Sequence, residues 1–229
     1  MDVHAPHEPI HGVKDFLLHL LTISVGLLIA VGIEGCVELH REHKLVKEAR
    51  ATMREEIESN SKEMTEAVEN IKKQKAAMQR NTAALTRILE SPKDKSAQDP
   101  EIDASYTNKT LKDTAWKTAQ TTGALSYMPY SEGEKYAAIY QAQAAFEAEE
   151  AKIVEDEAQL FGVLAKTNFG HGPVTPEKAS LALERFGIWQ GHLVYLNLMA
   201  RLSSQSDKAF LEGRKAPHSL SENLDNSDK

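Results

Sequence analysis

The residues of this sequence whose types could bind a metal ion are histidines that lie close to carboxylates. They form two groups, His4, His7 and His11 in the leader and His40 and His43 farther along. A di-iron site in a helical bundle needs Glu-x-x-His on two helices together with further carboxylates. Only Glu8 and His11 have that spacing, and Pro9 interrupts it. We therefore interpret these histidines as surface residues and predict neither a metal site nor a cofactor.

Nucleophilic and phosphate chemistry also lack their usual motifs in this chain. The sequence contains no Gly-rich phosphate loop, no serine in a nucleophile-elbow motif and no paired cysteine and histidine. Cys36 is the single cysteine, which excludes an intramolecular disulfide and a cysteine-based zinc site. We predict no catalytic residues and no enzymatic activity.

A run of carboxylates in the second half of the chain could attract a cation or a basic partner. It consists of Glu147, Glu149, Glu150, Glu155, Asp156 and Glu157. Because charge runs on helices usually face solvent, we interpret this run as a solvated helix face.

Five aromatic residues could line a small-molecule cleft between helices. They are Trp116, Tyr127, Tyr130, Tyr136 and Trp189. Aromatic residues at helical spacing usually belong to the core, and that interpretation is favoured here. If a cleft exists, the segment YMPYSEG is the one we expect to shape its opening.

The composition restricts the possible partners of the protein. The formal net charge is -7 and the apolar content is 41%, while the mean hydropathy is -0.44. Nucleic-acid binding requires clustered Lys and Arg on one face, and the sequence has no large basic field of that kind. We therefore predict a polar, helix-rich domain that does not bind nucleic acid.

The elements that must position any site begin with an apolar segment, Phe16 to Ile33, that contains no formally charged residue. As a helix it extends about 27 Å, close to the thickness of the hydrocarbon layer of a membrane. We predict a single transmembrane helix over 16–36, preceded by a short polar leader over 1–15.

The charges that flank this segment are asymmetric, with Lys14 before it. Arg41, Lys44, Lys47, Arg50 and Arg54 follow it. The positive-inside rule then places the C-terminal domain in the cytoplasm. Two alternatives stay open, namely a signal peptide cleaved after Ala30-Val31-Gly32 and a lipoprotein signal at Cys36, and both imply export.

One face of the predicted membrane helix is small and weakly polar. His19, Thr22, Gly26 and Ala30 lie within an arc of about 80° on a helix. Small residues at four-residue spacing let membrane helices approach closely. We predict that this face mediates self-association or binding to a membrane partner.

The helix is expected to continue outward over 37–90, because the first helix breaker is Ser91-Pro92. A seven-residue repeat runs along it at Ile57, Met64, Ile71, Met78 and Leu85. The companion positions include Asn60, Gln74 and Asn81, which suit a two-stranded coiled coil poorly. We therefore predict a stalk over 37–52 and a seam buried by helices of the same chain.

Those helices follow a polar linker over 91–105, which we interpret as an exposed loop. Thr110 and Ser131 are predicted N-caps of a short helix and of a long helix that ends near Lys166. Thr175-Pro176 begins the last helix, which reaches about Leu211. The buried positions predicted on these helices are Ile139, Phe146, Ile153 and Leu160, and then Leu181, Phe186, Trp189, Leu193, Leu196, Met199 and Leu202.

Two segments carry a family resemblance. VGLLIAVGIEG in the anchor and DTAWKTAQTTGALSYMPYSEGEKYAAIYQAQ farther on resemble an uncharacterised bacterial family of single-pass membrane proteins, a domain of unknown function. Its aromatic-x5-Ser/Thr-Gly signature corresponds to Trp116 and Thr122-Gly123. The resemblance implies a membrane-anchored helical domain and supplies no activity.

Together these features predict an all-α protein in which the membrane helix continues into a stalk and an antiparallel bundle, with bundle helices over 106–212 and a disordered tail over 213–229. We predict a scaffold or adaptor in the cell inner membrane, whose partners are the bilayer and either further copies or another membrane protein. The alternative is an exported ligand-sensing bundle with a small-molecule cleft.

Overall fold

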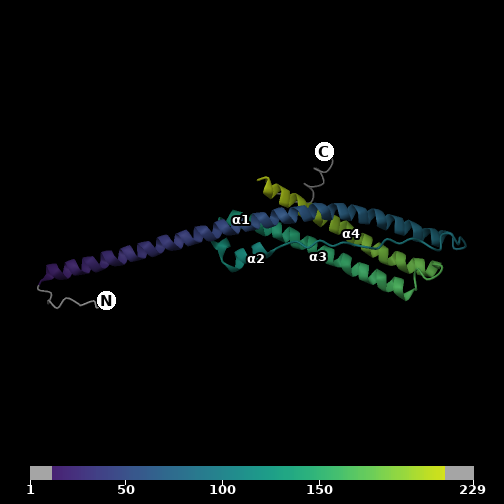
Figure 1. The fold of residues 1–229 in the computed structure, drawn as a ribbon, viewed down its shortest axis with the longest axis horizontal. Helices are drawn as coiled ribbons and strands as arrows, with labels where there is room; N and C mark the ends of the chain where they lie inside the picture. The colour runs from purple at the N-terminus through teal and green to yellow at the C-terminus, as the bar shows by residue number, and fades with distance from the viewer. Residues whose placement is uncertain (1–11, 215–229) are drawn as a thin grey trace. The chain divides into compact units, whose positions relative to one another are not determined.

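The computed structural model describes residues 12–214, and within that range all regular structure is helical. The elements are α1 (Val13–Glu90), α2 (Thr114–Thr121), the 3-10 helix η1 (Ala124–Tyr127), α3 (Tyr130–Lys166) and α4 (Pro176–Leu211) (Figure 1). The predicted all-α class is confirmed. Residues 1–11 of the leader and 215–229 of the tail lie outside the described range.

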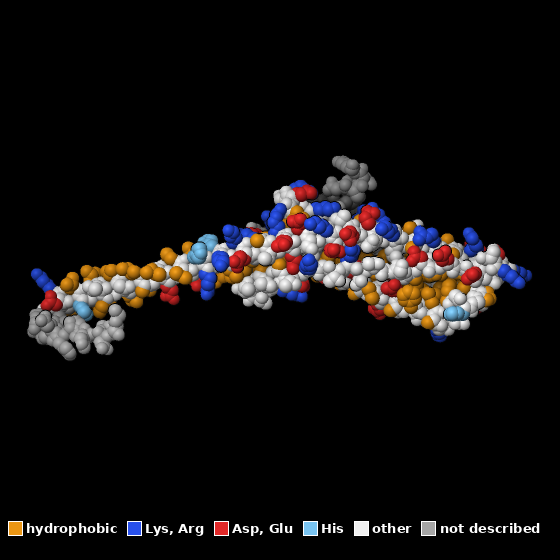
Figure 2. Space-filling view, viewed as in Figure 1, with side chains coloured by type: hydrophobic (Ala, Val, Ile, Leu, Met, Phe, Trp, Pro, Cys, Tyr) orange, Lys and Arg blue, Asp and Glu red, His pale blue; other side chains and the backbone are white. Residues whose placement is uncertain are grey.

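The chain divides into two compact units, Met1–Glu48 and Ala49–Lys229. In the first unit, the large apolar side chains of α1 between Phe16 and Leu39 are all exposed, and Figure 2 shows them as a hydrophobic surface along this part of the helix. By length and composition, α1 contains one segment that could cross a membrane.

The second unit is built around the predicted seam. Ile57, Met64, Ile71, Met78 and Leu85 are completely buried. Phe146, Ile153 and Leu160 of α3 and Phe186, Trp189, Leu193 and Leu196 of α4 share one hydrophobic core with Met64, Ile71, Met78 and Leu85. The fourth predicted position on α3, Ile139, is also buried. The prediction that Leu181 is buried is wrong, because its side chain is 46% exposed on the outer face of α4.

The helices α3 and α4 form an antiparallel hairpin, and their backbones approach each other closely along their length (Figure 1). Asn168 (φ 52°) and Gly170 (φ 82°) adopt left-handed conformations that turn the chain between the helices. Thr175 caps α4, since its Oγ1 accepts a hydrogen bond of 3.4 Å from the Lys178 N–H. This N-cap is therefore confirmed.

The other two predicted N-caps are wrong. The residue before α2 is Asp113, and the residue before α3 is Pro129; neither makes a side-chain capping bond. Ser131 lies inside the first turn of α3. In the first turn of α2, the Ala115 N–H instead donates to the carboxylate of Glu56 in α1. A local capping motif cannot reveal a partner so far away in the sequence.

The predicted linker over 91–105 contains no helix and most of its residues are exposed, as expected for a loop, but the segment between α1 and α2 is also packed on the bundle. Its residues 99–113, called the strap from here on, are extended and run beside α1 and α3 (Figure 1). Ala104 and Leu111 of the strap, and Ala97 just before it, are buried in the hydrophobic core. The strap is therefore a component of the bundle.

A prediction from this core concerns two phenylalanines of α3. Phe146 is completely buried, whereas Phe161 is 49% exposed. Replacing Phe146 with Ala should lower the free energy of unfolding by about 3–5 kcal/mol because it leaves a cavity. Phe161→Ala, the matched control, should change it by about 0.5 kcal/mol. Denaturant titration of the full chain in detergent measures both values, and equal losses would contradict this description of the core.

Candidate functional site

The first part of the candidate site is a pair of asparagines on α1, three heptads apart in the seam. Asn60 Nδ2 donates to the Lys112 carbonyl oxygen at 2.7 Å, and its Oδ1 accepts from the Lys112 N–H at 2.9 Å. Asn81 pairs with both backbone groups of Asp103 in the same way, at 2.6 and 3.1 Å. Each side-chain amide therefore binds both the backbone N–H and the backbone carbonyl oxygen of one strap residue, as the backbone of a neighbouring β-strand would.

The acidic run on α3 supplies the second part. Its carboxylates accept strap N–H groups: Glu147 from Leu111 at 3.1 Å, Glu150 from Lys109 at 2.9 Å, and Glu157 from Tyr106 at 3.2 Å. A solvated face is thus the wrong interpretation at these positions, and also at Asp156, which is buried and bonds His192 at 2.6 Å. Burial raises the pKa of Glu150, although the strap N–H favours its charged form.

The pairing at Asn60 continues into the core as a chain of buried polar groups. Asn60 Nδ2 also donates to Gln143 Oε1 at 2.9 Å, and Gln143 Nε2 donates to Asp207 Oδ1 at 3.0 Å. Asp207 Oδ2 and the nearby Ser203 Oγ are buried without a hydrogen-bond partner in the described part of the chain. Burial raises the pKa of Asp207 to about 7.

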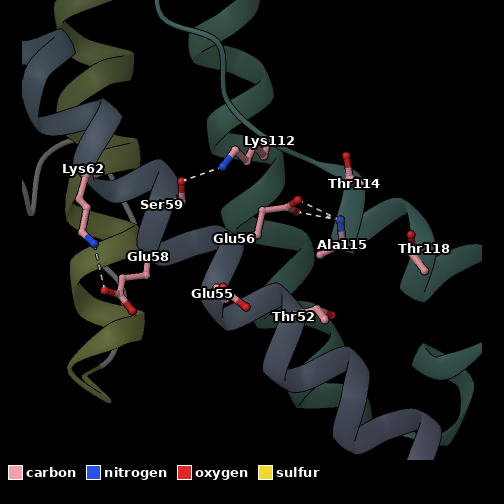
Figure 3. A pocket seen from close by; sticks show the side chains of 10 residues that line it. All are labelled: Thr52, Glu55, Glu56, Glu58, Ser59, Lys62, Lys112, Thr114, Ala115 and Thr118. Carbon is pink, nitrogen blue, oxygen red and sulfur yellow. Dashed lines mark hydrogen bonds and ion pairs between the residues drawn. The ribbon is translucent and has the colours of Figure 1, made fainter.

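A polar cleft opens beside the strap's C-terminal end, between α1 and α2, with a volume of about 660 Å³. Figure 3 shows Glu56 on its wall, with the carboxylate directed at the Ala115 N–H (2.9 and 3.1 Å). Glu56 Oε1 also accepts from the Tyr140 hydroxyl at 2.9 Å. This carboxylate is therefore occupied in holding α2 to the bundle.

The basic groups of the cleft are also paired. Lys62 Nζ bonds Glu58 at 3.2 Å, and Lys112 Nζ donates to Ser59 Oγ at 3.3 Å (Figure 3). Among the described residues, no group of three or more His, Cys, Asp or Glu side chains could hold a metal ion. The chemistry that this arrangement carries out is the binding of a backbone segment.

The five residues of the predicted aromatic cleft occupy different environments. Trp116 stacks on Tyr140, with ring centroids 5.2 Å apart, and both line a cavity of about 290 Å³. Tyr136 packs against Phe210 at 5.2 Å. The other three, Tyr127, Tyr130 and Trp189, do not line that cavity either: the two tyrosines are exposed, and Trp189 is completely buried in the core.

Sequence reasoning missed Gln143 and Asp207, which lie in the same heptad-spaced faces as the core residues. Gln143 is one helical turn from Phe146, and Asp207 is one seven-residue step from Ala200. A polar residue at a position that should be apolar is the signal that could have found both.

The predicted association face of the membrane helix consists of exposed residues. His19, Thr22, Gly26 and Ala30 are all exposed, and a Cβ atom built on Gly26 would meet nothing within 4 Å. The Thr22 hydroxyl donates to the Leu18 carbonyl oxygen at 2.9 Å, within its own helix. The role of this face in association stays a prediction.

Comparison of the chain with protein-family models, with curated proteins and with solved structures finds no match. The family resemblance of the membrane segment and of the Trp116 signature therefore stays a prediction, and the function is argued from the geometry.

Removing one seam amide tests the pairing between α1 and the strap. Asn60→Ala would leave both backbone groups of Lys112 and the Gln143 amide oxygen without their partner. We expect a loss of about 2–4 kcal/mol in the free energy of unfolding, since buried unsatisfied groups each cost about 1–3 kcal/mol. The control, Asn108→Ala on the exposed side of the strap, should have almost no effect. Denaturant unfolding compares the two, and a neutral Asn60→Ala would contradict the pairing.

A second prediction concerns pH. An unfolded Asp ionises near 3.8, whereas burial raises the pKa of Asp207 to about 7. Folding therefore favours the protonated form, so the contribution of this group to stability is complete below pH 3.8 and is lost as the pH rises through 7. Asp207→Asn keeps the acceptor for Gln143 without the charge.

This variant should be more stable than the natural chain by about 2–4 kcal/mol at pH 8 and nearly unchanged relative to it at pH 4. Denaturant unfolding at both pH values measures the difference. Glu184→Gln, on the exposed side of α4, is the control and should not alter the pH dependence. An Asp207→Asn chain that is less stable at pH 8 would contradict the buried, uncompensated charge.

Proposed function

We propose that the protein is a membrane-anchored helical scaffold or adaptor that positions a bundle near the bilayer and binds protein partners. The observation that carries this proposal is the dual character of α1. Between Phe16 and Leu39 its large apolar side chains are all exposed, whereas Ile57 to Leu85 form a completely buried seam. One helix thus combines a surface suited to lipid with a surface suited to a protein core.

The exposed apolar part has the properties of a single-pass anchor. Its eighteen uncharged residues, 16–33, would span most of a bilayer as a helix of about 27 Å. The basic residues after it favour a cytoplasmic C-terminal domain in the cell inner membrane. Three of them are paired with carboxylates, Arg41 with Glu38 at 2.7 Å, Lys44 with Glu48 at 3.8 Å and Arg50 with Glu132 at 2.7 Å.

The bundle supports a binding role better than a catalytic one. Its amide and carboxylate side chains hold the chain's own strap, and in the cleft between α1 and α2 Lys62 pairs with Glu58 while Glu56 binds the Ala115 N–H. The partners proposed are the bilayer and either further copies or a membrane protein, contacted through Gly26 and Ala30 on the small-residue face.

A second candidate function is an exported, ligand-sensing bundle. The observation that favours it is the cavity of about 290 Å³ beside Trp116 and Tyr140. Gln143 also lines this cavity and donates to Asp207 in the core. A ligand that bonded Gln143 would compete with Asp207 for the same amide, so ligand binding would change the core.

Membrane attachment and orientation are tested by fusing reporters at Lys229. We expect fluorescence from green fluorescent protein, no alkaline phosphatase activity, and flotation of the chain with membranes. Replacing Leu21 and Leu28 by Arg should abolish flotation, because each Arg at a helix centre costs about 2.5–3.5 kcal/mol on insertion. In the matched control, Arg replaces Leu181 and Val194, which are exposed in the bundle. This control chain should still float with membranes.

Phosphatase activity would contradict the cytoplasmic orientation and favour the sensing bundle. If the natural chain, which lacks the two Arg substitutions in α1, stayed in the soluble fraction, that result would contradict the proposed anchor.

A further inference from the structure

Another cleft opens between α1 and the strap, with a volume of about 400 Å³. Lys73, Gln74 and Arg80 of α1 and Asp103, Ser105 and Thr107 of the strap are among the residues that line it. All of them belong to the compact unit Ala49–Lys229. The cleft therefore lies entirely within the bundle, and its residues lie outside the apolar segment of α1.

Gln74 carries a buried donor that the strap does not satisfy. It occupies the same seven-residue column of α1 as Asn60 and Asn81, and it is only 7% exposed. Its Nε2 has no hydrogen-bond partner in the described part of the chain. The strap N–H groups of Tyr106 and Lys109 bond to α3 carboxylates instead. Because a buried donor without an acceptor is unfavourable, this amide has an unused capacity to bind a ligand.

The charges around Gln74 favour an anion. Lys73 forms no ion pair among the described residues, and the carboxylate of Glu69, which it influences, is bound by Lys72 at 2.7 Å. Arg80 contacts Asp103 at 3.7 Å, and both side chains are more than half exposed. Two cations and one carboxylate thus line the cleft. The lining has one excess positive charge, in a chain whose formal net charge is -7.

We propose that this cleft binds a small oxyanion, namely a carboxylate or phosphate group. Gln74 Nε2 and the Lys73 ammonium donate to its oxygens, and the Arg80 guanidinium, held only by an exposed ion pair, joins them. The terminal torsion of a Gln side chain is broad, so a rotation of the amide presents Nε2 to the cleft. The exposed hydroxyl of Thr107 adds a donor from the strap.

Such a ligand connects α1 to the strap between the two places where asparagines already do so. Asn60 and Asn81 bind Lys112 and Asp103 directly, whereas at Gln74 the connection passes through the bound ion. A ligand of the folded bundle stabilises it in proportion to its occupancy. Oxyanion binding therefore strengthens the attachment of the strap.

Isothermal titration of the full chain in detergent tests this site. Sodium phosphate is the probe in one arm and sodium succinate in the other, and sodium chloride keeps the ionic strength constant. We expect saturable binding of one ion per chain in at least one arm, and the arm with the tighter binding identifies the preferred group. Gln74→Leu and Lys73→Ala should each weaken binding about tenfold, because each removes one donor to the ion.

The matched controls are Gln79→Leu on α1 and Lys135→Ala on α3, both at exposed positions that do not line the cleft. They should bind the ion as the natural chain does. Circular dichroism shows whether each variant folds, and the exposed Lys73→Ala decides the test if Gln74→Leu does not. No saturable binding in either arm would overturn the proposal. Binding that the cleft variants leave as strong as the controls do would overturn it as well.

Discussion

An extended backbone can lie against a helix only if something satisfies its N–H and C=O groups, and in this bundle the side-chain amides of Asn60 and Asn81 do so. An α-helix has no free backbone groups along its length to pair with a strand. Each asparagine supplies one donor and one acceptor with the geometry of a peptide group. The strap can therefore replace a helix on one side of the core, where it buries the side chains of Ala104 and Leu111.

The same amides explain why the seam of α1 departs from an ordinary coiled coil. Polar residues at seam positions reduce the apolar area that a partner helix could bury, and they specify a particular partner. Here that partner is backbone rather than another seam. Gln143 extends the arrangement to Asp207, whose second carboxylate oxygen has no partner in the described part of the chain. A buried carboxylate of this kind reduces stability near neutral pH, which indicates that stability alone does not account for the polar core.

The sequence is sufficient to predict the features set by short repeats and by helix breakers. The heptad seam of α1, the end of α1 before Ser91-Pro92 and the Thr175 N-cap follow from such local patterns and agree with the structure. The strap was missed because its polar composition is typical of loops, while its order comes from residues far along the chain. The caps at Thr110 and Ser131 failed for a related reason, since a carboxylate of α1 bonds the first turn of α2. The acidic run of α3 was misinterpreted because several of its carboxylates accept backbone N–H groups of the strap, and no spacing rule identifies those donors.

Amide hydrogen exchange along the strap tests this account most directly, because it reports each N–H that the bundle is expected to bind. Exchange of the full chain in nanodiscs can be compared residue by residue with that of the bundle part of α1. The account predicts that the N–H groups of Asp103, Tyr106, Lys109, Leu111 and Lys112 are protected as strongly as those of the seam, and that of Asn108 much less. Uniformly fast exchange across the strap, with α1, α3 and α4 still protected, would contradict it.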